Sequence, residues 1–299
     1  MKKLVFTGSG VAMVTPMKQD GSVNYEMLGK LIEFHIQNGT DAIVTCATTG
    51  ESPVLSHEEH CSVIKFVVDH VNKRIPVVAS SGSNDTNYAV ELSRTAQELG
   101  ADALLMVTPY YNKTSQSGLV KHYNYVADRV DLPIILYNVP SRTGCNIKPE
   151  TYLELSKHPN IVATKEANGD ISSVAKTISL CGDDLCVYSG NDDQTLAMIA
   201  LGGKGVISVL ANILPDIMHH ICADYFSGNI EKSREAMLKY FELMEALFMD
   251  VNPIPVKASM KILGADCGDC RLPLTTMSKE SEAKLASILK KYQLSTIEI

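Results

Sequence analysis

The chain has 299 residues, of which 45% are hydrophobic and 20% charged, and it carries a formal net charge of −7. A chain of this size can bury a large core, and it exceeds the ~250 residues of a typical (β/α)8 barrel only modestly. Because no basic run concentrates positive potential, we expect no nucleic-acid partner and no membrane partner. A small-molecule partner is favoured.

Two apolar stretches do not predict a signal peptide or a membrane span. Residues 4–6 are followed by Thr7-Gly8-Ser9-Gly10 without a small-residue cleavage site, and region 195–215 is broken by Gly202-Gly203-Lys204-Gly205. We therefore expect mature protein.

The eight cysteines are scattered as reduced thiols would be, so we expect a cytoplasmic location. Cys267 and Cys270 form a lone Cys-x-x-Cys, which we interpret as ordinary loop cysteines.

Eight apolar runs of strand length follow one another along the chain, and each is followed by a segment with helical periodicity. Strands are predicted at residues 11–14, 42–46, 76–79, 103–107, 133–136, 161–163, 185–188 and 205–209. Helices are predicted after them at residues 24–37, 56–71, 86–99, 115–129, 149–156, 171–180, 192–201 and 215–226. The pair Gly8-x-Gly10 lies just ahead of the first of these strands, and it is no dinucleotide fingerprint.

The strict alternation of strands and helices predicts an α/β fold of the (β/α)8 TIM-barrel type over residues 1–229. An open, doubly wound sheet is the alternative. Beyond residue 229 only helices are predicted, at 230–249, 255–263 and 279–292. Residues 230–299 are therefore expected to form a small, all-helical C-terminal domain.

Polar side chains follow most of the predicted strands, where the catalytic groups of a (β/α)8 barrel lie. The residues after strands two to seven are Thr48, Thr49, Gly50 and Glu51; Ser80 and Ser81; Tyr110 and Tyr111; Tyr137 and Asn138; Lys165 and Glu166; and Ser189 and Gly190. Hydroxyls and one amine should therefore meet at one mouth of the barrel.

Lys165 directly follows the apolar run 161–164, so it is either solvated at the rim or directed into the barrel. The segment alone favours a solvated rim lysine. Its neighbours favour the second interpretation, because a buried amine can act as a nucleophile and the phenol of Tyr137 could pass protons to and from it.

Two further loops offer groups that can hold a carboxylate. Thr48 and Thr49 supply hydroxyls and backbone N–H groups next to Gly50, although ordinary turn residues explain the same pattern. Arg142 lies in a turn-rich loop after strand five, where its guanidinium could bind a carboxylate with two hydrogen bonds. A solvated loop arginine is the alternative.

These residues carry a resemblance to a known family. The segments 48–51, 109–112, 137–144, 165–167 and 252–257, taken as an ordered set, resemble the 4-hydroxy-tetrahydrodipicolinate synthase (dihydrodipicolinate synthase) family. This family is part of the N-acetylneuraminate lyase superfamily of class I pyruvate aldolases. The resemblance runs nearly end to end.

The resemblance implies a lyase of lysine (diaminopimelate) biosynthesis that condenses pyruvate with L-aspartate 4-semialdehyde. It implies that Lys165 forms a Schiff base with pyruvate and that Tyr137 donates and accepts protons through Thr48 and Tyr111, the latter from a neighbouring subunit. The substrate-binding residues it implies are Thr49, Arg142, Gly190 and Ile207. It further implies a homotetramer built as a dimer of dimers, without a metal or an organic cofactor.

Some members of the family bind lysine, and the matching residues here are Ser52, His57, His60, Asn84 and Tyr110. Tyr88 stands where those members have a glutamate, which leaves inhibition by lysine open. Sister aldolases that act on sugar acids share the lysine and the tyrosine but generally lack the Ser-Arg-Thr-Gly sequence that contains Arg142. They are the second hypothesis, and a non-catalytic barrel that binds a keto acid is the third.

Overall fold

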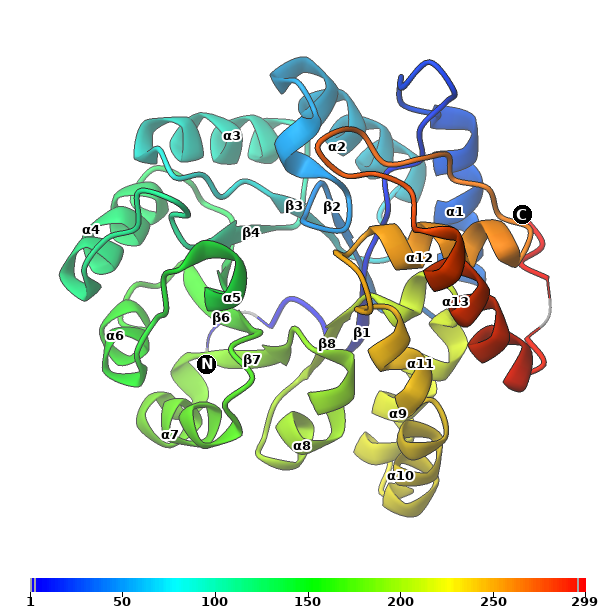
Figure 1. The fold of residues 1–299 in the computed structure, drawn as a ribbon. Coiled ribbons are helices and arrows are strands. Elements are labelled where there is room, and N and C mark those ends of the chain that lie inside the picture. Colours follow the sequence, from blue (N-terminus) through cyan, green and yellow to red (C-terminus); the bar gives the residue numbers. More distant parts are fainter. Residues whose placement is uncertain (1, 3, 295) are drawn as a thin grey trace.

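The computed structural model describes residues 2, 4–294 and 296–299. Eight parallel strands pair in sequence order, and β8 pairs with β1 to close a barrel (Figure 1). The strands are β1 (Gly8–Ala12), β2 (Ala42–Thr45), β3 (Val77–Ser80), β4 (Ala103–Val107), β5 (Ile134–Asn138), β6 (Ile161–Glu166), β7 (Cys186–Ser189) and β8 (Gly205–Ser208). The predicted TIM barrel is confirmed, and the open-sheet alternative is excluded.

Helices surround the barrel on its outer side (Figure 1). They are α1 (Tyr25–Gln37), α2 (His57–Val71), α3 (Thr86–Glu98), α4 (Gln116–Ala127), α6 (Pro149–Leu155), α7 (Ile171–Cys181), α8 (Thr195–Ala200) and α9 (Pro215–Phe226). The single turn α5 (Pro140–Thr143) lies instead at the mouth of the barrel, directly after β5 (Figure 1). Short 3-10 turns lie at η1 (Ser52–Val54), η2 (Gly182–Asp184), η3 (Asp192–Gln194) and η4 (Leu210–Asn212). No helix in the described part of the chain has the length and apolar content needed to cross a bilayer.

The C-terminal segment is helical: α10 (Ile230–Lys239), α11 (Phe241–Ala246), α12 (Ile254–Ile262) and α13 (Lys279–Lys291). The single helix predicted over 230–249 is wrong, because the chain breaks at Tyr240 between α10 and α11. The sequences of both segments have helical periodicity, so the break cannot be seen in the pattern. It goes with tertiary packing, because Tyr240 is buried and its ring stacks on Tyr292.

The first strand begins earlier than predicted. It contains Gly8 and Gly10, so the placement of these glycines ahead of a strand at 11–14 was wrong. Gly8 pairs with Gly205 at the start of β8, and a Cβ on Gly205 would lie 1.8 Å from the carbonyl oxygen of Gly8. The glycines therefore let the first and last strands approach closely enough to close the barrel.

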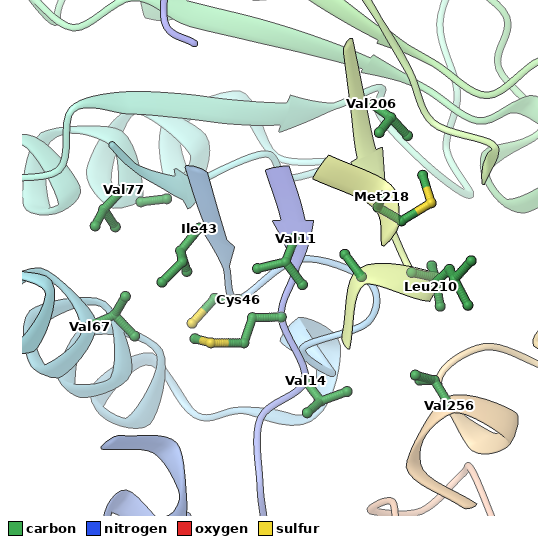
Figure 2. Packing of buried hydrophobic residues seen from close by; sticks show 14 of the residues in the cluster. Val11, Val14, Ile43, Cys46, Val67, Val77, Val206, Leu210, Met218 and Val256 are labelled. Carbon is green, nitrogen blue, oxygen red and sulfur yellow. The ribbon is translucent and has the colours of Figure 1, made fainter. Parts of the chain in front are cut away.

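The strands carry two buried layers of side chains. One cluster fills the interior of the barrel and includes Ile135, Tyr137, Ala163, Tyr188 and Ile207. The other lies between the barrel and the helices, and its members come from the alternate strand positions. Figure 2 shows part of this outer layer, including Val11, Ile43 and Val206, with Val256 of α12 packed into the same cluster as Leu210. The C-terminal segment therefore shares the core of the barrel.

A bulge in β6 changes the register of this strand against β5. Ile134 pairs with Ile161, but the next residue, Ile135, pairs with Ala163, so that Val162 is surplus. Val162 and Ala163 both belong to the interior cluster. In a regular ladder Tyr137 would pair with Thr164, whereas here it pairs with Lys165. The bulge therefore brings the lysine level with the tyrosine.

Candidate functional site

Lys165 lies inside β6, not after it as the sequence suggested, and its side chain enters the barrel mouth. It is 4% exposed, and its Nζ lies 4.3 Å from the centroid of the Tyr137 ring. Tyr137 is 6% exposed, and it belongs to β5 because that strand continues to Asn138. The interpretation of Lys165 as a solvated rim residue is therefore excluded. The amine and the phenol ring therefore meet in a buried setting, where little water can reach either group.

A cavity of about 490 Å³ opens above this pair at the carboxyl ends of the strands. It is lined by Thr48, Thr49, Tyr137, Val139, Ser141, Arg142, Lys165, Ala167, Gly190, Asn191, Val209, Phe248, Asp250, Val251 and Asn252. Of the predicted catalytic and substrate-binding residues, Ile207 and Tyr111 are not among them. Ile207 is buried deeper in β8, and Val209 lines the cavity two residues later. A space of this size can hold two small substrates.

Gly190 follows β7 and lies against the lysine stem. A Cβ at this position would be 3.2 Å from Cε of Lys165 and 2.8 Å from Cβ of Ala167. Its backbone N–H donates a 2.8 Å hydrogen bond to the carbonyl oxygen of Glu166. The glycine therefore leaves room for Lys165 and keeps the ends of β6 and β7 together.

Thr49 is held by a residue from the C-terminal segment. Nδ2 of Asn252 donates a 3.0 Å hydrogen bond to Oγ1 of Thr49, and both residues are buried. The backbone oxygen of Asn252 also accepts a 3.3 Å bond from the guanidinium of Arg142. The sequence analysis gave Asn252 no role. Its position within the segment 252–257 was the only signal in the sequence. Its contacts with Thr49 and Arg142 could not be predicted, because these residues are far away along the chain.

Arg142 is presented by α5, a single turn that the sequence analysis did not predict. Gly144 ends this turn in the left-handed conformation at φ 68°, and its N–H donates to the carbonyl oxygen of Pro140. The buried hydroxyl of Thr143 accepts bonds of 3.1 Å from the Thr108 hydroxyl and from the N–H of Cys145. Arg142 itself is exposed on this anchored turn. Its guanidinium therefore reaches the cavity from a rigid support.

Behind Lys165, on the outer face of β6, lies a buried carboxylate. Glu166 accepts hydrogen bonds from the Tyr152 hydroxyl at 2.8 Å, from Nδ2 of Asn138 at 2.9 Å and from the N–H of Asn168 at 3.1 Å. Burial raises the pKa of Glu166 to about 7, although these donors act in the opposite direction. The network ties the ends of β5 and β6 to α6, which fixes the strands that carry Tyr137 and Lys165.

Tyr111 stands apart from the other predicted catalytic residues. It is 90% exposed and adopts the left-handed conformation at φ 70°. Thr48, its predicted partner in proton transfer, is half-buried and lines the cavity. A single copy of the chain therefore brings together Lys165, Tyr137 and Thr48 but leaves Tyr111 outside.

The residues matched to a lysine site gather around a second cavity of about 470 Å³. Ser52, His60 and Tyr110 line it together with Tyr88, whereas His57 and Asn84 do not. Tyr88 is 37% exposed, and its hydroxyl lies 3.3 Å from Nδ1 of His57. Asn84 donates to the carbonyl oxygen of Tyr110 at 3.2 Å. Thr48, Tyr137 and Arg142 also line this cavity, so it adjoins the one above Lys165.

Cysteine and histidine chemistry does not extend the site. Cys267 and Cys270 are free thiols, and burial raises their pKa values to about 12 and about 11. Within residues 2, 4–294 and 296–299, no group of three histidine, cysteine or acidic side chains could hold a metal ion. The chemistry of the described site therefore centres on the amine of Lys165 and on hydroxyl groups.

The comparison with known families agrees with this arrangement. The family model described as the dihydrodipicolinate synthetase family matches residues 5–292. The chain belongs to the dihydrodipicolinate synthetase family. A member from Acetivibrio thermocellus, named 4-hydroxy-tetrahydrodipicolinate synthase, is 53% identical over 294 residues, covering 98% of this chain and all of that protein.

Solved structures of the dihydrodipicolinate synthetase family match the whole barrel and the C-terminal helices. The Acinetobacter baumannii enzyme, described as chloride-inhibited and complexed with pyruvate, has a TM-score of 0.94 at 43% identity and covers 96% of this chain and 99% of its own. The Cyanidioschyzon merolae enzyme, described as having lysine bound, has a TM-score of 0.94 at 37% identity and covers 98% of this chain and 100% of its own.

Proposed function

We propose that the chain condenses pyruvate with L-aspartate 4-semialdehyde to give 4-hydroxy-tetrahydrodipicolinate, in the lysine (diaminopimelate) branch of amino-acid biosynthesis. The observation that carries this proposal is the buried amine of Lys165, 4.3 Å from the Tyr137 ring centroid, at the base of a cavity that Arg142 also lines. The names of the family members with over half of their residues identical to this chain support the choice of substrates.

The reaction begins at Lys165. Its amine adds to the keto carbon of pyruvate and water leaves, which forms an iminium cation. The cation withdraws electrons from the methyl group, so a methyl proton can leave to Tyr137 and an enamine results. Since the lysine supplies the electron sink, these steps require no metal and no organic cofactor.

The enamine carbon then attacks the aldehyde carbon of the semialdehyde, whose oxygen takes a proton from Tyr137. The amino group of the semialdehyde adds to the iminium carbon and expels the amine of Lys165, which closes a six-membered ring. The balance is one water released for each pair of substrates. Tyr137 moves these protons, and we propose that Thr48 and Tyr111 connect it to solvent.

Four residues would place the substrates. The hydroxyl of Thr49, already held by Asn252, would bind the pyruvate carboxylate, and Arg142 would bind the carboxylate of the semialdehyde with two charged hydrogen bonds. Gly190 would shape the pocket beside the lysine, and Ile207 would support it from deeper in β8. The pyruvate complex of the Acinetobacter baumannii relative supports pyruvate as one of the substrates.

We propose that the chain works as a homo-oligomer, a tetramer assembled as a dimer of dimers. Tyr111 is 90% exposed in a single chain, which is the position of a side chain that serves the site of a neighbouring copy. We also place this biosynthetic reaction in the cytoplasm, where both small substrates would be available.

Lysine is proposed as an effector at the second cavity, with Ser52, His57, His60, Asn84 and Tyr110 around it. The lysine-bound relative from Cyanidioschyzon merolae supports such a site. Tyr88 places a neutral phenol where a carboxylate would pair with the amine of lysine, so we expect lysine to bind weakly.

The proposal is tested by reducing the protein with borohydride in the presence of pyruvate and mapping the adduct by mass spectrometry. We expect one pyruvate-derived adduct on Lys165 and none in the Lys165→Ala variant. Failure to trap any adduct would overturn the Schiff-base chemistry and favour a barrel that only binds keto acids.

Turnover assays separate the proposed reaction from that of the sugar-acid aldolases. We expect turnover with pyruvate and L-aspartate 4-semialdehyde but not with N-acetylneuraminate or 2-keto-3-deoxygluconate. Cleavage of either sugar acid in preference to synthesis would contradict the proposal. Turnover is needed for this distinction, because pyruvate would be trapped on Lys165 in both cases.

A further inference from the structure

One carboxylate lines the cavity above Lys165, and the mechanism above does not use it. Asp250 belongs to the segment 247–253 between α11 and α12, where it is half-buried. Its Oδ1 accepts a 2.7 Å hydrogen bond from the N–H of Val251, and its Oδ2 has no hydrogen bond to a described residue. Among the described residues that line this cavity, Asp250 is the only one with an acidic side chain.

The other carboxylates near the strand ends face elsewhere. Glu51 is buried against the ammonium group of Lys257, and Glu166 lies on the outer face of β6 with Tyr152. Asp192 is buried, and its Oδ2 accepts hydrogen bonds from two backbone N–H groups just after β8. None of these three acids lines the cavity above the lysine. A ligand in this cavity therefore meets the carboxylate of Asp250.

Arg142 and Asp250 bring opposite charges to this cavity without neutralising each other. Neither side chain takes part in an ion pair within residues 2, 4–294 and 296–299. The guanidinium of Arg142 instead donates at 3.3 Å to the backbone oxygen of Asn252. Because consecutive Cα atoms are ~3.8 Å apart, the Cα atoms of Asp250 and Asn252 are at most ~7.6 Å apart. The two charges therefore lie along the same edge of the cavity.

The side-chain amide of Asn252 adds negative potential at this edge. Its Nδ2 donates to Thr49, and its Oδ1 is buried without a hydrogen-bond partner among the residues that the structure describes. An unpaired amide oxygen carries a partial negative charge, which is weakly screened in a buried setting. A cation beside Asp250 is therefore favoured by both groups.

This arrangement is complementary to the amino-acid end of L-aspartate 4-semialdehyde. That molecule carries a carboxylate and an ammonium group on the same carbon atom, so the partners of the two groups must lie close together. A carboxylate in the cavity wall weakens the binding of anionic substrates unless one of them also carries a positive charge. Pyruvate carries none, and 2-keto-3-deoxygluconate has only hydroxyl groups along its chain. The semialdehyde is the substrate whose charges match this edge.

We propose that Asp250 is a specificity-determining residue that binds the ammonium group of the semialdehyde while Arg142 binds its carboxylate. Asp250 thereby selects an amino aldehyde over aldehydes that lack the amine. Holding both groups fixes the orientation of the carbon that bears them and presents the aldehyde to the enamine on Lys165. This inference rests on the proposed function, because it takes the semialdehyde as the second substrate.

The test compares two aldehydes that differ only in the amine. Succinic semialdehyde has the chain and the carboxylate of L-aspartate 4-semialdehyde, but it carries hydrogen in place of the amino group. In the Asp250→Asn variant we expect the half-saturating concentration of L-aspartate 4-semialdehyde to rise roughly tenfold. The inhibition constant of succinic semialdehyde in the same assay should stay the same or fall, because for this anion the variant loses a repulsion.

Matched variants separate the charge of Asp250 from its shape. Asp250→Asn can keep the hydrogen bond from the N–H of Val251 through its amide oxygen, and Asp250→Glu keeps the charge and should retain most of the discrimination. Asp266→Asn is the control, because Asp266 also accepts a nearby backbone N–H, that of Gly268, but lines neither cavity. We expect it to behave as the wild type. The borohydride-trapped pyruvate adduct shows that each variant is folded, since pyruvate lacks the group that Asp250 binds.

Equal weakening of both aldehydes in Asp250→Asn, or no change in either, would overturn the inference. A loss in Asp250→Glu as large as that in Asp250→Asn would also overturn it, because shape would then explain the result. Should Asp250→Asn fail to trap pyruvate, Asp250→Ser removes the same charge and provides the same comparison. A wild-type protein that traps pyruvate but does not turn over L-aspartate 4-semialdehyde would instead overturn the proposed function.

Discussion

Nζ of Lys257 lies 2.5 Å from Oε1 of Glu51, and both side chains are buried. Lys257 belongs to α12, whereas Glu51 follows β2 next to Thr48 and Thr49. The other carboxylate oxygen accepts a 2.8 Å bond from the N–H of Arg271, and Glu51 is held in the left-handed region at φ 57°. The C-terminal segment, through α12 and the stretch that follows it, therefore fixes the conformation of a loop at the candidate site.

Replacing Lys257 with methionine should destabilise the protein strongly. The substitution leaves the carboxylate of Glu51 buried without its charge partner, which costs about 3–5 kcal/mol. Urea unfolding should show this loss as a lower midpoint. Lys261→Met is the control from the same helix, because its exposed ammonium is 3.8 Å from Asp266 and should contribute less than ~1 kcal/mol. Equal midpoints for the two variants would contradict the role of the buried pair.

Glu166 should make the stability of the fold depend on pH. In the folded protein its pKa is about 7, against an ordinary value of 4.5. Between these two values the folded state binds more protons than the unfolded state, so the free energy of unfolding falls as the pH rises. The total loss is about 3 kcal/mol, and it is nearly complete at pH ~8, about one unit above the folded pKa.

The Glu166→Gln variant isolates this contribution because it cannot ionise. Relative to the variant, the wild type should lose about 3 kcal/mol between pH 4 and pH 8, measured by urea unfolding at each pH. Glu26→Gln, at an exposed position on α1, should follow the wild type. A constant difference between the wild type and Glu166→Gln across this range would show that Glu166 ionises normally.

The Arg142→Ala substitution should weaken the binding of the semialdehyde and leave the reaction with pyruvate unchanged. Loss of hydrogen bonds to a charged group costs about 1.5–3 kcal/mol, so the half-saturating semialdehyde concentration should rise roughly 10- to 100-fold. The borohydride-trapped pyruvate adduct should form as in the wild type. Arg129→Ala, which removes an arginine stacked on Tyr125 at the surface, should change neither quantity. Unaltered semialdehyde kinetics in Arg142→Ala would remove Arg142 from the site.

Tyr88→Glu should increase sensitivity to lysine. The new carboxylate would stand beside His57 at the edge of the second cavity and could pair with the amine of lysine. Initial rates against lysine concentration should show inhibition at roughly tenfold lower lysine than in the wild type, which corresponds to about 1.4 kcal/mol. Tyr88→Gln changes the shape of the side chain without adding charge and should not have this effect. Equal inhibition curves for the Tyr88→Glu and Tyr88→Gln variants would exclude a charge effect.

The sequence was sufficient to predict the order of the strands, because each is a continuous apolar run between helical segments. The same reasoning placed Lys165 after a strand, since Lys165 and Glu166 read as polar residues that end an apolar run. Their burial depends on partners far along the chain, such as Tyr152 for Glu166. Asn252 was missed for the same reason, and α5 is too short for a periodic signal. The domain boundary at residue 229 stays a prediction.

The surplus residue at Val162 limits how this barrel could be re-engineered. Transplanting the lysine and the tyrosine onto another (β/α)8 scaffold with a regular fifth and sixth strand would place them in different rows, and the amine would face the helices. The irregularity must be carried over with the side chains. Likewise, deletion of one residue from this strand would disable the protein while leaving every proposed catalytic residue in its sequence.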